Sequence, residues 1–199
     1  VTIKVVTRLD GSPVLVRYLE IANTGRKPAA LSSVSPWSGV LWNTNTALPR
    51  HYTNVNPSFD ERGRSKFSLG YLAGDDWAAE GDLVWQALPP ENFRIERRQG
   101  RCFGSPYYIL RNEATGELVF MGLAWGGNLF AEFAYRYDAV LSFRIGPLAS
   151  APLRLIAPGE TVISPEVHLG AMHGSFDEAV GLWHRHMRAS VISPRPKGR

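Results

Sequence analysis

Residues 118–138 have the sequence LVFMGLAWGGNLFAEFAYRYD, and the pattern of apolar side chains in this stretch decides the fold class. Leu118–Trp125 is apolar at nearly every position, which predicts a central strand covered on both faces. Residues 132–138 alternate instead, so that one face of a strand carries three aromatic rings, those of Phe133, Tyr135 and Tyr137. The glycine-rich residues 122–128 between the two patterns predict a hairpin turn.

The same two-residue alternation recurs along the chain, and each run predicts a strand with one face on a core and the other in water. The clearest runs are Val1–Val5, Phe93–Glu96 and Leu141–Ile145. Turn sequences separate them: Asp10–Pro13, Asn23–Gly25, Ala114–Gly116 and Ala157–Gly159. Many short strands with frequent turns are typical of an all-β sandwich or barrel.

One segment near the C-terminus has helical features. Ser175 and Glu178 form the pattern of a capping box, in which each side chain accepts from the other residue's backbone N–H. Phe176, Trp183 and Met187 then recur at helical spacing on one face. Basic residues fill the last turns, where positive charge suits the helix dipole. We therefore predict one C-terminal α-helix with an apolar face.

The bulk composition limits the classes of partner and compartment. Of the 199 residues, 44% are hydrophobic and 20% charged, as in globular proteins. The net charge of +4 comes from scattered basic residues, so we expect no nucleic-acid partner. The longest apolar region, Leu118–Tyr135, is interrupted by glycines, Asn128 and Glu132, so we expect no membrane partner. Cys102 is the single cysteine and can form no internal disulfide, which fits a reducing compartment and a cytoplasmic location.

We predict one β-sandwich domain over residues 1–190, followed by a linker over residues 191–199. Ser193–Arg199 is rich in proline and basic residues and has no apolar period, as is typical of a domain edge. Because the first residue is Val rather than Met, we expect either a processed chain or, in preference, a piece of a longer protein. Residues 43–82 carry one expected strand, near Lys66–Leu72, so this long stretch is a natural place for a ligand or partner.

The polar residues form no recognisable catalytic or metal-binding motif. The acidic cluster has neither the spacing of a calcium loop nor the facing placement that a glycosidase carboxylate pair needs, and we interpret it as a solvated loop. Its members are Asp75, Asp76, Glu80 and Asp82. His184 and His186 point about 200° apart on a helix, so they cannot readily share one ion. We interpret them as ordinary helix C-terminal histidines, and expect no catalytic residue, metal ligand or cofactor.

Tryptophan supplies the candidates for ligand contact, because its flat ring can stack on the apolar face of a sugar. Trp is also commonly buried in cores, which is the alternative for each of the six in the chain. The candidate contact residues are Trp42, Trp77, Trp125 and Asn128.

Several short sequence motifs, called words here, follow one another in a characteristic order along the chain. They are Val16–Gly25, Ile95–Arg101 with Ser105–Leu110, Thr115–Glu117, Leu123–Asn128, Pro158–Glu160 with Ser164–Val167, and Trp183–His186. Gly74, Trp77 and Glu80 add a Gly-x-Trp-x-x-Glu element. In this order the words resemble the N-terminal domain of glycoside hydrolase family 36. Ser105-Pro106-Tyr107 replaces the family's Asn-Pro-Phe and Gly126-Gly127-Asn128 its Ser-Gly-Asn, which leaves the substrate open.

The resemblance implies a galactose-mutarotase-like β-supersandwich with one C-terminal α-helix, placed before a (β/α)8 barrel that hydrolyses α-galactosides with retention. In that family both catalytic aspartates lie on the barrel, so the resemblance implies a non-catalytic domain. It also implies that the family's first strands are missing here, so that the domain is truncated at its N-terminus. The implied partners are the C-terminal barrel of the parent chain, further copies in a homo-oligomer, and an α-galactoside as a candidate ligand. The helix face of Phe176, Trp183 and Met187 is then expected to pack between domains.

Two other functions stay open at this point. Exposed aromatic side chains would suit a stand-alone carbohydrate-binding module. A self-sufficient sugar epimerase on the same fold would need a glutamate base and histidine acids, and Glu166 with His168 is the nearest such pair. Residues two apart on a strand share a face, so the pair is geometrically feasible.

Overall fold

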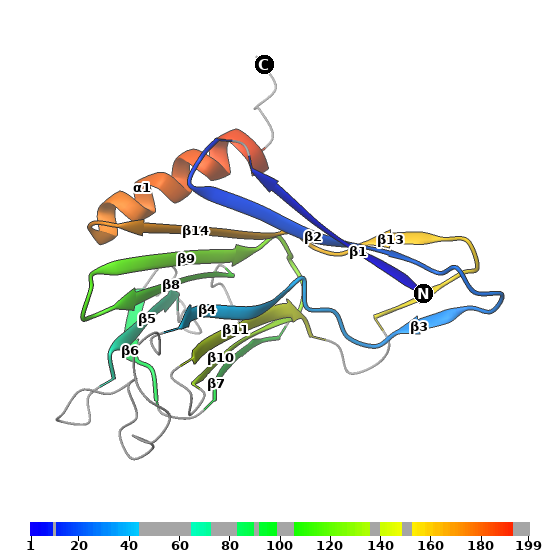
Figure 1. Ribbon diagram of the computed structural model, residues 1–199, viewed down its shortest axis with the longest axis horizontal. Helices are drawn as coiled ribbons and strands as arrows, with labels where there is room; N and C mark the ends of the chain where they lie inside the picture. The colour runs from blue at the N-terminus through cyan, green and yellow to red at the C-terminus, as the bar shows by residue number, and fades with distance from the viewer. Residues whose placement is uncertain are drawn as a thin grey trace.

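The computed structural model describes residues 1–9, 11–43, 65–72, 83–89, 92–98, 106–135, 140–148 and 153–192. Within these ranges the chain forms β-strands and, near its C-terminal end, one α-helix (Figure 1). The predicted all-β fold with a C-terminal helix is therefore confirmed. Trp77, Cys102 and the acidic residues Asp75, Asp76, Glu80 and Asp82 lie outside the described residues.

The larger sheet joins the two ends of the chain. Its order is β1-β2-β14-β9-β8-β5-β6, with β13 also paired to β2. The strands are β1 (Thr2–Leu9), β2 (Val14–Ala22), β5 (Phe67–Leu72), β6 (Leu83–Ala87), β8 (Tyr107–Asn112), β9 (Glu117–Leu123), β13 (Thr161–Ile163) and β14 (Val167–His173). Their pairings are antiparallel, and β5 is the strand expected near Lys66–Leu72.

The smaller sheet lies against the larger one and has the order β4-β11-β10-β7 (Figure 1). Its strands are β4 (Trp37–Asn43), β7 (Phe93–Arg97), β10 (Leu129–Tyr135) and β11 (Val140–Pro147). A short separate ribbon pairs β3 (Ala29–Leu31) with β12 (Arg154–Ile156).

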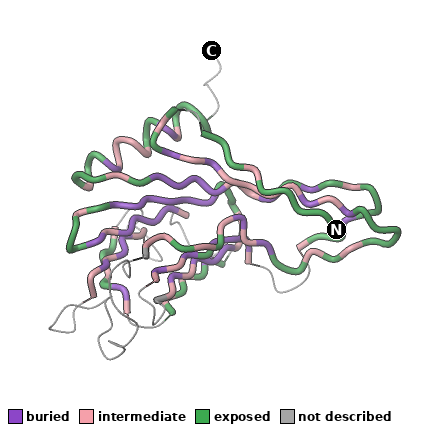
Figure 2. The backbone as a smooth tube through the Cα atoms, viewed as in Figure 1, coloured by how far each residue is buried: buried purple, intermediate pink, exposed green. Residues whose placement is uncertain are grey.

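The main core fills the space between the two sheets. Phe133 and Phe143 of the smaller sheet pack with ring centroids 4.9 Å apart, and Tyr108 of the larger sheet meets Phe133 edge-on at 6.2 Å. The alternation predicted for residues 141–145 is confirmed, since Leu141, Phe143 and Ile145 are all buried. Figure 2 shows this burial along the facing strands of both layers.

The prediction of a hairpin at residues 122–128 is wrong. β9 pairs with β8 and β14 in the larger sheet, whereas β10 pairs with β7 and β11 in the smaller one. Residues 124–128 therefore cross from one sheet to the other. β14 and β8 occupy the two edges of β9, so β10 cannot pair with β9 and joins the other sheet. The glycine-rich composition correctly indicated a change of chain direction, but it did not indicate which strand β10 would pair with.

A helix covers the outer face of the larger sheet (Figure 1). It comprises α1 (Phe176–His186) and a π-helical turn, η1 (Met187–Val191). The predicted capping box is present: the Ser175 hydroxyl accepts from the Glu178 backbone N–H at 3.3 Å, and the Glu178 carboxylate accepts from the Ser175 backbone N–H at 2.7 Å.

Strand β1 departs from its predicted half-burial. Ile3 and Val5 have exposed fractions of 59% each, although they alternate with polar residues. β1 is an edge strand of the larger sheet, and it extends beyond the smaller sheet (Figures 1 and 2). Alternation predicts the strand correctly but does not reveal whether a second layer covers it.

Candidate functional site

Trp125 lies on the segment that crosses between the two sheets. The residue is 40% exposed, and its indole N–H donates to the Asn128 backbone carbonyl at 3.0 Å. The ring also lies against Gly127, where an added Cβ would approach the indole nitrogen to 2.8 Å. The hydrogen bond and this close contact fix an exposed aromatic face in one orientation. Asn128, a predicted contact residue, thus positions Trp125 through its backbone.

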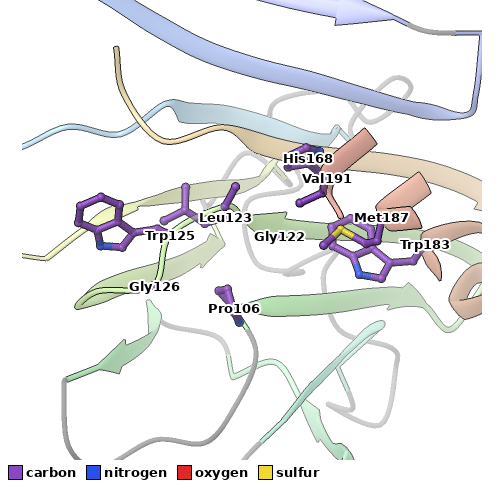
Figure 3. A pocket seen from close by; sticks show the side chains of 10 residues that line it. Pro106, Gly122, Leu123, Trp125, Gly126, His168, Trp183, Met187 and Val191 are labelled. Atoms are coloured by element: carbon purple, nitrogen blue, oxygen red, sulfur yellow. The ribbon is translucent and has the colours of Figure 1, made fainter. Parts of the chain in front are cut away.

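Two pockets meet at Trp125. One, of about 260 Å³, lies between the crossing segment and the end of the helix. Figure 3 shows Trp125 at one end of this pocket and Trp183, Met187 and His168 at the other. The other, of about 310 Å³, includes Leu31, Leu153 and Pro165. The structure therefore brings the predicted residues Trp125, Trp183 and Met187 to one predominantly apolar pocket.

The apolar face of α1 packs on the sheet of its own chain. The Trp183 ring lies 4.7 Å from the Tyr107 ring and 6.1 Å from the Phe120 ring, and Phe176 meets Trp85 edge-on at 5.7 Å. Much of the surface expected to pack between domains is thus used within this domain. Whether Phe176, Trp183 and Met187 also contact another domain stays a prediction.

Beneath the end of α1, two buried imidazoles meet. His168 of β14 and His186 of α1 are 2% and 3% exposed, and the distance from His168 Nδ1 to His186 Nε2 is 2.8 Å. Burial, then the charge of His186, then that of Arg8, lowers the pKa of His168 from 6.5 to about 4. His168 is therefore neutral near pH 7.

A carboxylate and a guanidinium extend this pair to the surface. Glu166 Oε2 lies 3.6 Å from His168 Nε2, and the other oxygen of Glu166 accepts from Arg8 of β1. A carboxylate beside Nε2 favours the tautomer with the proton on that nitrogen. His168 Nδ1 then accepts a hydrogen bond from His186 Nε2–H. Arg8, Glu166, His168 and His186 thus form one row of polar contacts that runs from the surface to the buried end of α1.

His184 and His186 both lie in the last turn of α1, as predicted, but His186 is not an ordinary exposed helix-end residue. His184 is exposed, but His186 is buried against His168. The helical stripe through Ala179 and Trp183 continues to His186 at i, i+4 and i+7, and this signal identifies its inward position. His168 lines the pocket but is only 2% exposed, and His186 is buried and not among the lining residues. This burial leaves a sugar little access to the imidazoles, which argues against the epimerase hypothesis that relied on Glu166 and His168.

The remaining candidates contribute less. Trp42 is only partly exposed, and its ring packs 5.2 Å from the ring of Phe67, against the main core. Its place in the core leaves its predicted sugar contact without support. Within the described ranges, no group of three or more potential ligand side chains gathers to hold a metal ion. No described helix has the length and apolar character needed to span a bilayer.

Neither a protein-family model nor a curated protein matches the sequence. Solved structures do. A variant of a family 36 α-galactosidase from Geobacillus stearothermophilus, in complex with 1-deoxygalactonojirimycin, matches with a TM-score of 0.71 and 17% identity over 97% of this chain and 25% of that chain. The galactosidase domain of an α-galactosidase–sucrose kinase matches with a TM-score of 0.67 and 18% identity, over 94% of this chain and 24% of that chain. The α-galactosidase from Lactobacillus brevis matches with a TM-score of 0.66 and 16% identity, over 94% of this chain and 23% of that chain.

The chain shares the fold of one part of these α-galactosidases. It spans about a quarter of their length, so the likeness concerns one domain of a larger chain. This confirms the fold implied by the sequence resemblance to the N-terminal domain of glycoside hydrolase family 36. At identities of 16–18% the likeness is one of architecture, and the α-galactosidase activity itself belongs to the proposal below.

Proposed function

We propose that this chain is a non-catalytic N-terminal domain of an α-galactosidase-like glycoside hydrolase, where it supports a catalytic barrel and the assembly of subunits. One observation carries the proposal: 94–97% of the chain aligns with 23–25% of three α-galactosidase chains. Most of each matched enzyme has no counterpart in these 199 residues.

Three of the described glutamates support a non-catalytic role. A glycosidase general acid needs a pKa raised toward neutrality, so that it still carries a proton. Hydrogen bonding to Arg94 instead lowers the pKa of Glu96. The Ala157 backbone N–H lowers that of Glu160, and the Ser175 backbone N–H lowers that of Glu178. These carboxylates serve ion pairs and caps, which require the charged form.

The end of the helix is the surface that we assign to the barrel. Met187 lines the pocket beside Trp125, while Val191 and Ile192 are 37% and 57% exposed. Met187 lies just before the predicted linker, residues 191–199, and Val191 and Ile192 are the first two residues of that range. Phe176 and Trp183 support the same helix from beneath by packing on the sheet.

The test is the reading frame beyond Arg199 and the activity of its full product. We expect alternating strands and helices with two barrel aspartates, and hydrolysis of a 4-nitrophenyl α-galactoside by the complete protein. Light scattering should show an oligomer. A stop codon after Arg199, or a complete protein without glycosidase activity, would contradict the proposal.

A second candidate function, carbohydrate binding by this domain alone, is favoured by Trp125. Its exposed ring is held by the Asn128 carbonyl and by contact with Gly127, so little conformational freedom is lost when a sugar stacks on it. Two pockets flank the ring and offer room for a pyranose.

Calorimetry of the chain with galactose, melibiose and raffinose tests this second function. We expect millimolar binding that Trp125→Ala weakens at least tenfold. Trp85→Ala is the matched control, because Trp85 is 37% exposed but lies on β6, away from the pockets. Absence of heat with all three sugars at tens of millimolar, or equal loss in both variants, would rule out the Trp125 site.

A further inference from the structure

We propose that the buried His168–His186 pair is a pH-sensitive latch, which holds α1 and η1 on the outer face of the larger sheet and releases them on acidification. The latch joins β14 to the last turn of α1 through one hydrogen bond of 2.8 Å. It goes beyond the proposed function and holds for this domain whatever enzyme contains it.

The position of the pair makes it a latch rather than an ordinary contact. The N-terminal end of α1 is fixed by its cap at Ser175, and its middle by the Trp183 ring on Tyr107 and Phe120. At the C-terminal end, the side chain that enters the protein is His186, and its partner is another imidazole. The centroid of the Trp183 ring lies 6.3 Å from that of the His168 ring and 6.1 Å from that of the His186 ring, so Trp183 packs beside both imidazoles.

Among the residues that the structure describes, the charged groups around His168 offer little compensation for an imidazolium. On β1, Arg8 adds positive charge, and it already shares the carboxylate of Glu166, which lies just before β14. On β8, burial raises the pKa of Tyr107, so its phenol stays neutral. On β9, the residue opposite His168 is Gly122. The exposed charged groups at the near end of the helix are basic, Arg185 and Arg188, and the acidic Asp177 and Glu178 lie in its first turn. A proton on His168 therefore adds a buried positive charge near a guanidinium.

Linkage gives the direction of the response. The pKa of His168 is about 4 in the closed protein and returns toward 6.5 when the ring reaches water. A depressed pKa means that the closed form keeps its full stability above about pH 6.5 and loses it as the pH falls toward 4. From these two pKa values, the open-to-closed ratio should rise roughly fiftyfold between pH 7 and pH 4.5.

Hydrogen exchange of the complete 199-residue chain, expressed as protection factors, measures this release. We expect the protection of residues 176–191 to fall roughly fiftyfold between pH 7 and pH 4.5, while β10 and β11 keep theirs. In parallel, NMR titration of the imidazoles should show His168 neutral down to about pH 4. Unchanged helix protection, or titration of both rings near 6.5, would overturn the latch.

Variants separate the latch from general acid instability. His168→Asn with His186→Gln removes both titrating groups and should abolish most of the pH response of residues 176–191. His184→Gln is the control, since His184 is exposed on the same helix and should leave the response intact. A full response in the double variant would refute the latch. If that variant fails to fold, the wild-type imidazole titration decides alone.

Discussion

Two glycines of the larger sheet face aromatic rings at close range. At Gly122, an added Cβ would lie 2.7 Å from the Trp183 ring and 3.2 Å from the Pro106 carbonyl oxygen. At Gly170, an added Cβ would lie 2.3 Å from the Phe120 ring. The outer face of the larger sheet is thus shaped to receive rings, which is why the helix can lie close to it.

Gly122→Ala should therefore displace Trp183 and destabilise the domain by about 1–3 kcal/mol, as is usual for overpacking. Urea unfolding followed by circular dichroism measures the change. Gly126→Ala is the matched control, because an added Cβ there meets nothing within 4 Å. Equal stability of the two variants would contradict the close packing of Trp183 on β9.

Single residues were partly predictable from the sequence. The apolar stripe Phe176–Trp183 follows from helical spacing, and its inward orientation is confirmed by the contacts with Trp85 and Tyr107. The partner of His186 was not predictable, because His168 lies 18 positions away on a strand whose neighbours only the tertiary fold determines. The role of Trp125 as a sugar contact stays a prediction.

At the level of elements, the helix has the best-defined start in the chain. Ser175→Ala removes the hydroxyl that accepts from the Glu178 backbone N–H, and should cost about 1 kcal/mol of stability. Ser33→Ala, at an exposed position far from the helix in the sequence, should change little. Thermal unfolding of both variants beside the parent tests the cap, and an unchanged midpoint for Ser175→Ala would show that the helix does not depend on it.

Strand positions were predicted well, and strand partners were not. The period of two identifies β7, β10 and β11 because each has one face on the main core. It cannot identify β9 and β10 as members of different sheets, because pairing depends on which edges are free in the folded protein. The hairpin expected at residues 122–128 failed for this reason.

Across the whole molecule, burial is concentrated between the sheets and absent at β1. Phe143→Ala, in the main core, should destabilise the domain by about 3–5 kcal/mol. Ile3→Ala, at a residue 59% exposed on β1, should cost less than about 0.5 kcal/mol. Denaturant unfolding of the pair measures both. A comparable loss for Ile3→Ala would show that β1 is covered by a second layer or by another copy in solution.

The pairing of β2 with β14 has a consequence for how the protein is made. Val16 lies opposite His168, so the hairpin of β1 and β2 lacks its β14 neighbour until about 150 further residues have been synthesised. Such distant pairings fold slowly, and unpaired strand edges are prone to aggregate. We therefore expect the nascent chain to need protection of residues 2–22 during translation, and its yield to depend on chaperone supply more than its final stability would indicate.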